Sequence, residues 1–488
     1  MRGFKRFAKR AGVALLVLVG VLALLIFGTR AHFQRQGERE LGEVTAKLDA
    51  DDPGWRMESI LERRNGQSIA ADQDAAPIVF RVIEQGRPEW EKYRYLIDAS
   101  ERDTRVNYTP RFELLVWIAG GRSATEGART TAREQLLTRP AGRYPLQMKD
   151  NPFSTLLPHL EKVRSVANLL DYDAALASLD GDPTRGLRSA RSCINVSRSI
   201  GDEPCLISQL VRMACGNVAS RSAMRVLAWG ELAGPSADAE LSALQAAFAA
   251  EAETPWFEYG VRGERAMIHQ FFDGLETGRI QSEELTSLMG NGSPAFLRSR
   301  AFTLYRGFLP GDHAESLRIM TRYLEICKLP YHERRAAMQS VKFPPKPPES
   351  LGYILTNLIL PATDKVATAG LRCRGELLSA SVAVACERYR LKHGHWPESL
   401  EAIPKEILPA IPTDPFDGEP IRYRPMPDGI AVFSIDPDGL KPPENFNQQQ
   451  SGPFNGLGVG WRMYDPERRG LPPEYVRPVP GFEESVMP

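Results

Sequence analysis

Apolar residues recur at three- and four-residue spacing through most of the chain, which predicts a protein built mainly from α-helices. The clearest series lies between 153 and 340 and begins with Leu156, Leu160, Val163 and Val166. Turn residues interrupt it at 181–183 (Gly-Asp-Pro) and at 201–204 (Gly-Asp-Glu-Pro). Short turns between helices of this length are typical of antiparallel hairpins, so we expect a domain of stacked, solenoid-like helical hairpins over 151–342.

The most apolar segment is 11–28, AGVALLVLVGVLALLIFG, which carries no charge. At about 1.5 Å per residue, a helix of this length reaches about 27 Å, close to the hydrocarbon thickness of a bilayer. Five basic residues precede the segment within 1–10. By the positive-inside rule we expect an N-terminal transmembrane helix that anchors the protein in the cell inner membrane, with 1–10 cytoplasmic and the body extracytoplasmic. The alternative is a signal peptide cleaved near Thr29-Arg30-Ala31, which would also export the body.

Between the apolar segment and the hairpins, 29–150 is predicted as a juxtamembrane helical region. Helices are expected over 33–50 and over 75–84, where apolar residues share one face. Between them, Asp52-Pro53-Gly54-Trp55 has the composition of a tight turn.

The C-terminal third contains a second kind of pattern. A proline-rich linker at 343–349 precedes 350–440, which predicts a long helix and then two short strands of alternating apolar residues around an Asp-Gly turn. We expect a small α+β module in which an antiparallel hairpin packs on the helix. The segment 441–488 is rich in proline and glycine, and we expect an irregular tail.

Residues 364–439 resemble the C-terminal region of the major pseudopilins of type II secretion. The residues that carry this resemblance are Glu387-Arg388-Tyr389, Lys392-His393-Gly394-His395-Trp396-Pro397, Pro412-Thr413-Asp414-Pro415-Phe416 and Ser434-Ile435-Asp436-Pro437-Asp438-Gly439. The resemblance implies a helix packed on a small sheet, and a calcium site in the loop that holds Asp436 and Asp438. Two carboxylates are few for an ion that takes six to eight oxygens, and the alternative is a plain Asp-Pro-Asp-Gly turn, so we expect no cofactor. The chain lacks a prepilin signature, which argues against a fibre subunit.

The rest of the chain resembles a group of large membrane-anchored bacterial proteins of uncharacterised function with a helical body. The residues that carry this second resemblance are the turn Asp52–Trp55 and Arg262-Gly263-Glu264-Arg265 in a mid-chain helix. This resemblance implies no activity.

Composition narrows the function classes. The formal net charge is zero, and outside 1–10 the chain has five more acidic than basic residues, so we expect no nucleic-acid partner. The six cysteines form no Cys-x-x-Cys pair and have apolar neighbours, which favours buried thiols over a disulfide framework.

The common hydrolase, metalloprotease and nucleotide-binding signatures are absent from the sequence. The best polar constellation is Glu264, His269 and Asp273, where a carboxylate beside a histidine could serve as an acid–base pair or as metal ligands. The alternative is a salt-bridge ladder along a helix. Two functions follow. The first is a non-enzymatic scaffold tethered to the membrane through 11–28, with a protein partner in the cell envelope. The second is an exported hydrolase with an all-α active site.

Overall fold

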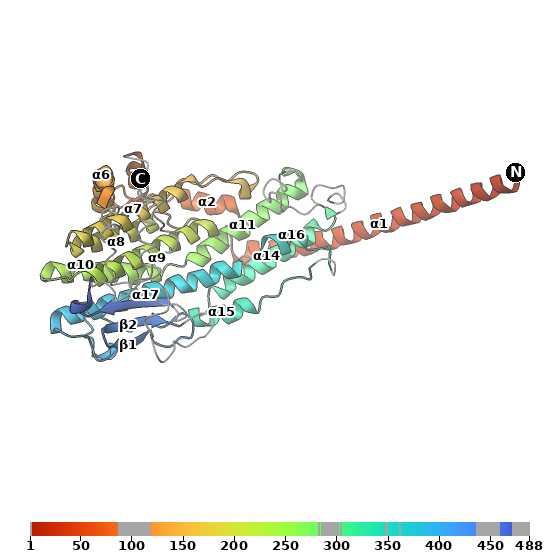
Figure 1. Cartoon of the computed structure of the whole chain (residues 1–488). Helices are drawn as coiled ribbons and strands as arrows, with labels where there is room; N and C mark the ends of the chain where they lie inside the picture. Colours follow the sequence, from red (N-terminus) through yellow and green to blue (C-terminus); the bar gives the residue numbers. More distant parts are fainter. Residues whose placement is uncertain are drawn as a thin grey trace.

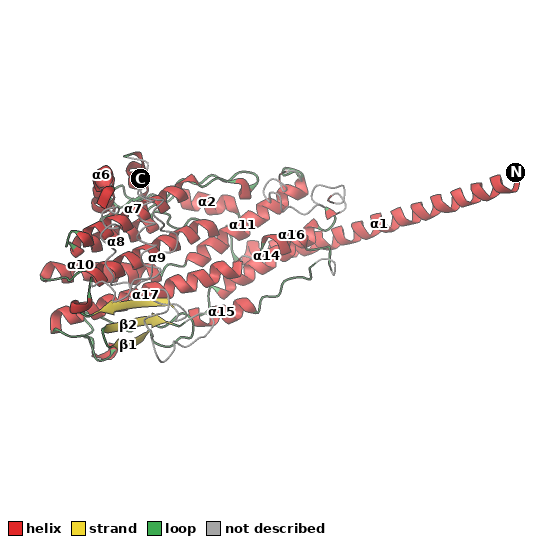
Figure 2. Ribbon diagram, viewed as in Figure 1, coloured by secondary structure: helices red, strands yellow, loops and turns green. Residues whose placement is uncertain are grey.

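The computed structural model describes residues 2–85, 119–281, 284, 302, 305–346, 350–360, 363–435 and 459–470. This part of the chain is mainly helical, as predicted, and includes a small antiparallel sheet beside the helical body (Figure 2). All six cysteines lie in it as buried thiols.

The first helix, α1 (Arg2–Asp51), runs without a break through the apolar segment into a charged one. Figure 1 shows its N-terminal half projecting from the body, while its C-terminal half packs along α14 (Leu309–Ile326). Within the described residues, no helix is both long enough and apolar enough to cross a membrane. The predicted transmembrane helix at 11–28 is therefore wrong. The segment is not an element of its own but part of one 50-residue helix that also carries many charged side chains.

Two glycines allow α1 to approach α14 closely. A Cβ atom on Gly37 would lie 2.5 Å from the backbone nitrogen of Gly311, which is closer than real Cβ contacts. Because neither residue has a side chain, the two helix backbones can meet at this crossing. The crossing fixes the position of α1 against the rest of the body.

Three short or medium helices follow α1. They are α2 (Met57–Asn65), α3 (Ala76–Glu84) and α6 (Arg122–Leu136). The predicted turn at 52–55 lies between α1 and α2, and Gly54 adopts a positive φ of 84° there. The predicted helix over 75–84 corresponds to α3.

The helical-hairpin region consists of long helices joined by short turns. The helices are α7 (Pro158–Leu179), α8 (Pro183–Arg198), α9 (Leu206–Trp229), α10 (Pro235–Ala252) and α11 (Trp256–Thr277), and the short 3-10 helix η1 (Pro152–Ser154) precedes them. Both predicted breaks occur. At the first, Gly181 has a φ of 71° and Asp182 caps α8 by accepting a hydrogen bond from the backbone N–H of Arg185 at 3.0 Å. At the second, Gly201 has a φ of 64° between α8 and α9.

One large apolar core joins these helices. α7, α8 and α9 all pack on one another, α10 packs on α8, and α11 packs on α9 and α14. Leu170, Ile194 and Val226, from α7, α8 and α9, are all fully buried in it.

The long helix predicted over 364–392 is α17 (Thr363–His393), which packs along α10 and α9. Before it lie α15 (Tyr331–Gln339) and α16 (Ile354–Ile359). Of the predicted linker, 343–346 has no regular structure, and 347–349 lies outside the described residues.

The predicted hairpin is formed by β1 (Arg422–Met426) and β2 (Gly429–Ser434), which pair antiparallel with Arg422 opposite Phe433. A third strand, β3 (Val459–Tyr464), pairs antiparallel with β2, with Gly429 opposite Tyr464. The 3-10 helices η4 (Leu400–Ala402) and η5 (Pro466–Arg468) flank the sheet strands in sequence. The sheet packs on α17 (Figure 1).

The third strand comes from the segment expected to be an irregular tail. It is held to the helical body by Trp461, whose indole N–H donates to Ser220 Oγ at 2.8 Å, and by Arg469, which binds both carboxylate oxygens of Glu387 on α17. These contacts hold β3 and the residues after it against α9 and α17, although the composition of the segment predicts an irregular tail. The resemblance of this module to pseudopilins stays a prediction.

Candidate functional site

The three predicted site residues all lie on α11, but the structure brings only two of them together. His269 and Asp273 line one cavity of about 770 Å³. Glu264 lies on another face of the helix, where its carboxylate accepts a hydrogen bond from the backbone N–H of Leu206 at 3.1 Å and so caps the start of α9. Burial raises the pKa of Glu264 to about 7.

The cavity lies where α1 passes α11 and the start of α14. Its lining is polar and charged on most sides, and it includes Arg30, Gln34 and Glu38 from α1, Arg56 from the turn before α2, His269, Asp273 and Glu276 from α11, and Arg306 from the segment before α14. The wall therefore consists of residues far apart in sequence, and it exists only because α1 docks on α14.

His269 is the first member of a hydrogen-bonded series of three groups, of which His313 is buried and the other two are half-buried. Its Nδ1 lies 3.0 Å from Nε2 of His313 on α14, and Nδ1 of His313 lies 3.1 Å from Oε1 of Glu276 on α11. Aromatic rings hold both imidazoles in place. Trp55 packs on His269 with ring centroids 4.6 Å apart, and Phe272 stacks on His313 at 5.0 Å. We call His269, His313 and Glu276 the relay.

Burial makes the neutral form of each relay member the stable one near neutral pH. It lowers the pKa of His269 to about 4, with further contributions from His313 and Arg56, and it lowers the pKa of His313 to about 3. Burial, with the charges of Asp273 and Glu38, raises the pKa of Glu276 to about 8. The contact between His313 and Glu276 is therefore a hydrogen bond between neutral groups at pH 7 rather than an ion pair.

Asp273 belongs to the wall of the cavity but not to the relay. Its carboxylate forms an ion pair with Arg279 beyond the end of α11, and both side chains are more than two-fifths exposed. A largely solvated pair of this kind contributes little to stability.

The turn at 52–55 meets the Arg262–Arg265 segment of α11 beside the relay. Asp52 accepts hydrogen bonds from Arg262 and Arg265. Trp55 is fully buried against His269, and its indole N–H donates to Asp49 Oδ1 at 2.9 Å. The end of α1 is thus fixed directly to the helix that carries His269.

Arg30 and Arg306 of the cavity wall differ from Arg56 in whether a carboxylate binds them. Arg56 binds Asp49. Within the described ranges, neither Arg30 nor Arg306 has a carboxylate partner, and Arg306 instead donates to the carbonyl oxygen of Leu275 at 2.9 Å. Their charges are available to a ligand.

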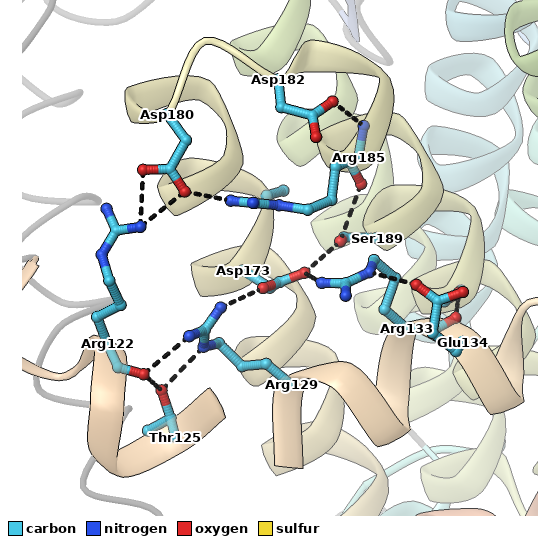
Figure 3. A network of polar contacts seen from close by, with 12 residues as sticks. Arg122, Thr125, Arg129, Arg133, Glu134, Asp173, Asp180, Asp182, Arg185 and Ser189 are labelled. Carbon is cyan, nitrogen blue, oxygen red and sulfur yellow. Dashed lines mark hydrogen bonds and ion pairs between the residues drawn. The ribbon is translucent and has the colours of Figure 1, made fainter. Parts of the chain in front are cut away.

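A second polar cluster lies between α6, α7 and α8 (Figure 3). Asp173 on α7 is fully buried and lies 2.6 Å from Arg129 and 2.7 Å from Arg133, while Ser189 donates to it at 2.6 Å. Burial alone would raise the pKa of Asp173, but Arg133, Ser189 and Arg129 outweigh it and hold the pKa below its usual value. Neither the cavity between α1, α11 and α14 nor a smaller one between α15 and α17 is lined by residues of this cluster. We interpret it as structural.

Metal binding finds no support in the part of the chain that the structure describes, where no group of three or more His, Cys, Asp or Glu side chains is arranged to hold an ion. The calcium candidates Asp436 and Asp438 lie outside the described residues. Asp414, in the Asp-Pro-Phe segment at 414–416, accepts hydrogen bonds from Ser434 Oγ and the backbone N–H of Ile435, both at 2.8 Å, and so fixes the end of β2.

Sequence reasoning found His269 but missed His313 and Glu276. Glu276 is seven residues from His269, which is two helical turns and the same face, so helical spacing could have included it. His313 is 44 residues away on another helix, and no local pattern connects it to His269. No family model, curated protein or solved structure matches the chain.

Proposed function

We propose that the helical body binds a small ligand with an anionic group in the cavity between α1, α11 and α14. The observation that carries this proposal is the pair Arg30 and Arg306 in the wall, which in the described residues has no carboxylate to neutralise it. Guanidinium groups bind carboxylates and phosphates in bidentate geometry, which gives both affinity and orientation.

The other charges of the wall support the same ligand class. Asp273 is paired with Arg279, Arg56 is paired with Asp49, and the raised pKa of Glu276 keeps that carboxyl largely neutral at pH 7. Glu38 is the remaining acidic residue of the wall, and it accepts a hydrogen bond from Gln34 at 3.0 Å. The cavity therefore carries a positive charge balance toward a ligand, although the described chain as a whole is not basic.

The test is thermal unfolding and calorimetric titration of the full chain with phosphate, sulfate, acetate and citrate at constant ionic strength. A ligand at ten times its Kd stabilises the folded state by about 1.4 kcal/mol, which is measurable as a rise in Tm. We expect this rise to be lost in Arg30→Gln and in Arg306→Gln. Arg322→Gln is the matched control, because Arg322 is an exposed arginine on α14 that pairs with the exposed Glu325 and does not line the cavity.

Two results would contradict the proposal. One is the absence of any saturable binding across the panel. The other is an equal rise in Tm for all three variants, because exclusion of sulfate and phosphate from protein surfaces stabilises any folded protein without a site.

A second candidate function is protein interaction, which was the first hypothesis from the sequence. The observation that favours it is the exposure of large apolar side chains on the projecting half of α1, where Leu16, Leu24 and Phe27 are 73%, 75% and 62% exposed. Exposed apolar clusters mark interaction surfaces more often than chance. The export of the body and a partner in the envelope stay predictions.

The test of this second function is site-specific photo-crosslinking in cells. A crosslinker at Leu24 should give one discrete adduct that saturates with expression level, whereas a crosslinker at Glu43, an exposed polar position on the same helix, should give none. Equal or diffuse crosslinking at the two positions would mean that α1 has no specific protein partner.

A further inference from the structure

The relay links Glu276, which is half-buried and itself lines the cavity, to His269 through His313. Each ring nitrogen that faces another relay member is within hydrogen-bond distance of it, at 3.0 Å and 3.1 Å. The remaining nitrogen, Nε2 of His269, has no partner among the described residues, and His269 lines the cavity. The series therefore ends in a group that can exchange a proton with a ligand.

We propose that His269 is the acid–base group of this cavity, and that His313 transfers its proton to and from Glu276. This inference rests on the proposed binding function and adds chemistry to it. The ligand would carry, beside its anionic group, an oxygen or nitrogen that takes up or releases a proton. His313 and Glu276 act through His269 and are positioning residues, so their contribution must be visible in the dependence of His269 on pH.

The proton balance follows from the donors and acceptors of the three groups. In the neutral relay, the Glu276 carboxylic acid donates to Nδ1 of His313, Nε2–H of His313 donates to Nδ1 of His269, and Nε2–H of His269 points toward the ligand. When the ligand takes the proton from His269, one proton moves along each hydrogen bond toward the cavity. Glu276 is then a carboxylate, both imidazoles remain neutral, and His269 presents a lone pair. The reverse sequence takes a proton from a ligand.

This arrangement gives His269 the acidity of a carboxyl group with a raised pKa, not that of an imidazolium. An isolated buried histidine would have to become a cation in a site that disfavours charge. In the relay the charge appears at Glu276, whose side chain is about a fifth exposed, and not at His313, which is almost fully buried. The relay is therefore an acid below about pH 8 and a base above it.

Other charged groups face the relay from each element packed around it. They are Arg30 and Glu38 of α1, Arg56 before α2, Glu58 of α2, Asp273 of α11 and Arg306 before α14. The two groups that act most directly on Glu276, Asp273 and Glu38, are acids, and both raise its pKa. They therefore favour the protonated form of Glu276.

The experiment measures the reaction of His269 with diethyl pyrocarbonate, which modifies an imidazole only through a free lone pair. The full chain is treated between pH 5 and pH 9.5, and mass spectrometry of peptides quantifies each histidine. The ionised fraction of a group with a pKa of about 8 rises about tenfold between pH 7 and pH 9. We expect the rate at His269 to rise by about this factor with a midpoint near pH 8. The exposed His395 in the same sample corrects for reagent hydrolysis.

Glu276→Gln provides the decisive variant. A glutamine amide can donate to Nδ1 of His313 but cannot ionise, so His269 keeps its Nε2–H and should react slowly at every pH. Glu325→Gln, an exposed substitution on α14, should leave the wild-type profile unchanged. A midpoint below pH 7, or a profile that persists in Glu276→Gln, would overturn the inference.

A second measurement covers the case in which Glu276→Gln does not fold. Nitrogen-15 NMR of the wild-type histidines reports the tautomer directly, and Nε2 of His269 should change from protonated to unprotonated through the same pH range. Nδ1-protonated His269 already at pH 6 would also overturn the relay. Neither measurement depends on a bound anion, so loss of anion binding with an intact pH profile would contradict the proposed function alone.

Discussion

Two buried polar regions of this molecule respond to burial in opposite ways. Around Asp173, two arginines and a serine compensate the carboxylate, and its pKa stays below the usual value. Around His313 and Glu276, no cation among the described residues offsets burial, which shifts each pKa toward the neutral form. The first region holds α6, α7 and α8 together, whereas the second lines a cavity.

This contrast separates buried charged groups that stabilise the fold from buried titratable groups that can act on a ligand. Fully paired buried ions maintain one arrangement and have no remaining capacity for a ligand. Groups that stay neutral through burial retain a proton to give or a lone pair to offer, and such groups cluster at functional sites. Three predictions test whether the two regions differ in this way.

The largest effect is expected for Asp173→Ala. The substitution leaves Arg129 and Arg133 without their shared counter-charge in a buried position, and removal of one partner of a buried pair costs about 3–5 kcal/mol. The measurement is the free energy of unfolding by urea at pH 7. Asp238→Ala is the control, because Asp238 is about half exposed and its pair with Arg388 is worth about 0–1 kcal/mol. Equal losses in the two variants would remove the distinction between the clusters.

Glu276→Gln is expected to have an intermediate effect, and to raise the free energy of unfolding rather than lower it. In the folded wild type this carboxyl holds its proton up to about pH 8, whereas in the unfolded chain it loses the proton near pH 4.5. The stability that the raised pKa of Glu276 contributes to the folded state is therefore fully present below pH 4.5 and is lost as the pH rises to 8. Gln does not titrate, so the variant should gain about 2 kcal/mol or more relative to wild type between pH 5 and pH 8. Urea unfolding at several pH values measures the difference, and parallel curves for the two proteins would show that Glu276 ionises normally.

The smallest effect is expected at the crossing that forms the cavity wall. Gly37→Ala puts a methyl group into the backbone of Gly311 and should cost about 1–2 kcal/mol, the lower part of the range for overpacking. It should also weaken anion binding, because α1 must move. Gly28→Ala on the same helix has nothing within 4 Å and should be neutral or slightly stabilising. Anion binding that is unaffected by Gly37→Ala would show that α1 is not part of the site.

Local chemistry explains which parts of this fold the sequence predicts. Gly181 and Gly201 end their helices because the chain needs a positive φ there, and this requirement is visible in the sequence. The hairpin of β1 and β2 follows from alternation around Asp428-Gly429 for the same reason. Hydrophobicity alone was a poorer guide at 11–28, because it does not show that the segment continues into a charged helix.

The site and the third strand depend on contacts that no local pattern encodes. His269 and His313 meet because α11 packs on α14, and Arg30 lines the same cavity as His269 because α1 docks on α14, where Gly37 meets Gly311. Likewise, Val459–Tyr464 alternates too briefly, between proline- and glycine-rich segments, to indicate a strand. Pairing with β2 and the partners Ser220 and Glu387 stabilise it.

The docking of β3 has a consequence for the order in which the protein can fold during synthesis. Trp461 binds Ser220, which leaves the ribosome 241 residues earlier, and the backbone N–H of Gly470 binds the carbonyl oxygen of Ala228. Ser220 at the centre of α9 and the buried Glu387 can therefore bind their partners Trp461 and Arg469 only after these residues have been translated. Contacts with such sequence separation are slow to form, because the loop between them must close first. A nascent chain that stops before 459 lacks β3 and leaves exposed the parts of α9 and α17 that this strand covers, so the helices can form before their native packing is complete.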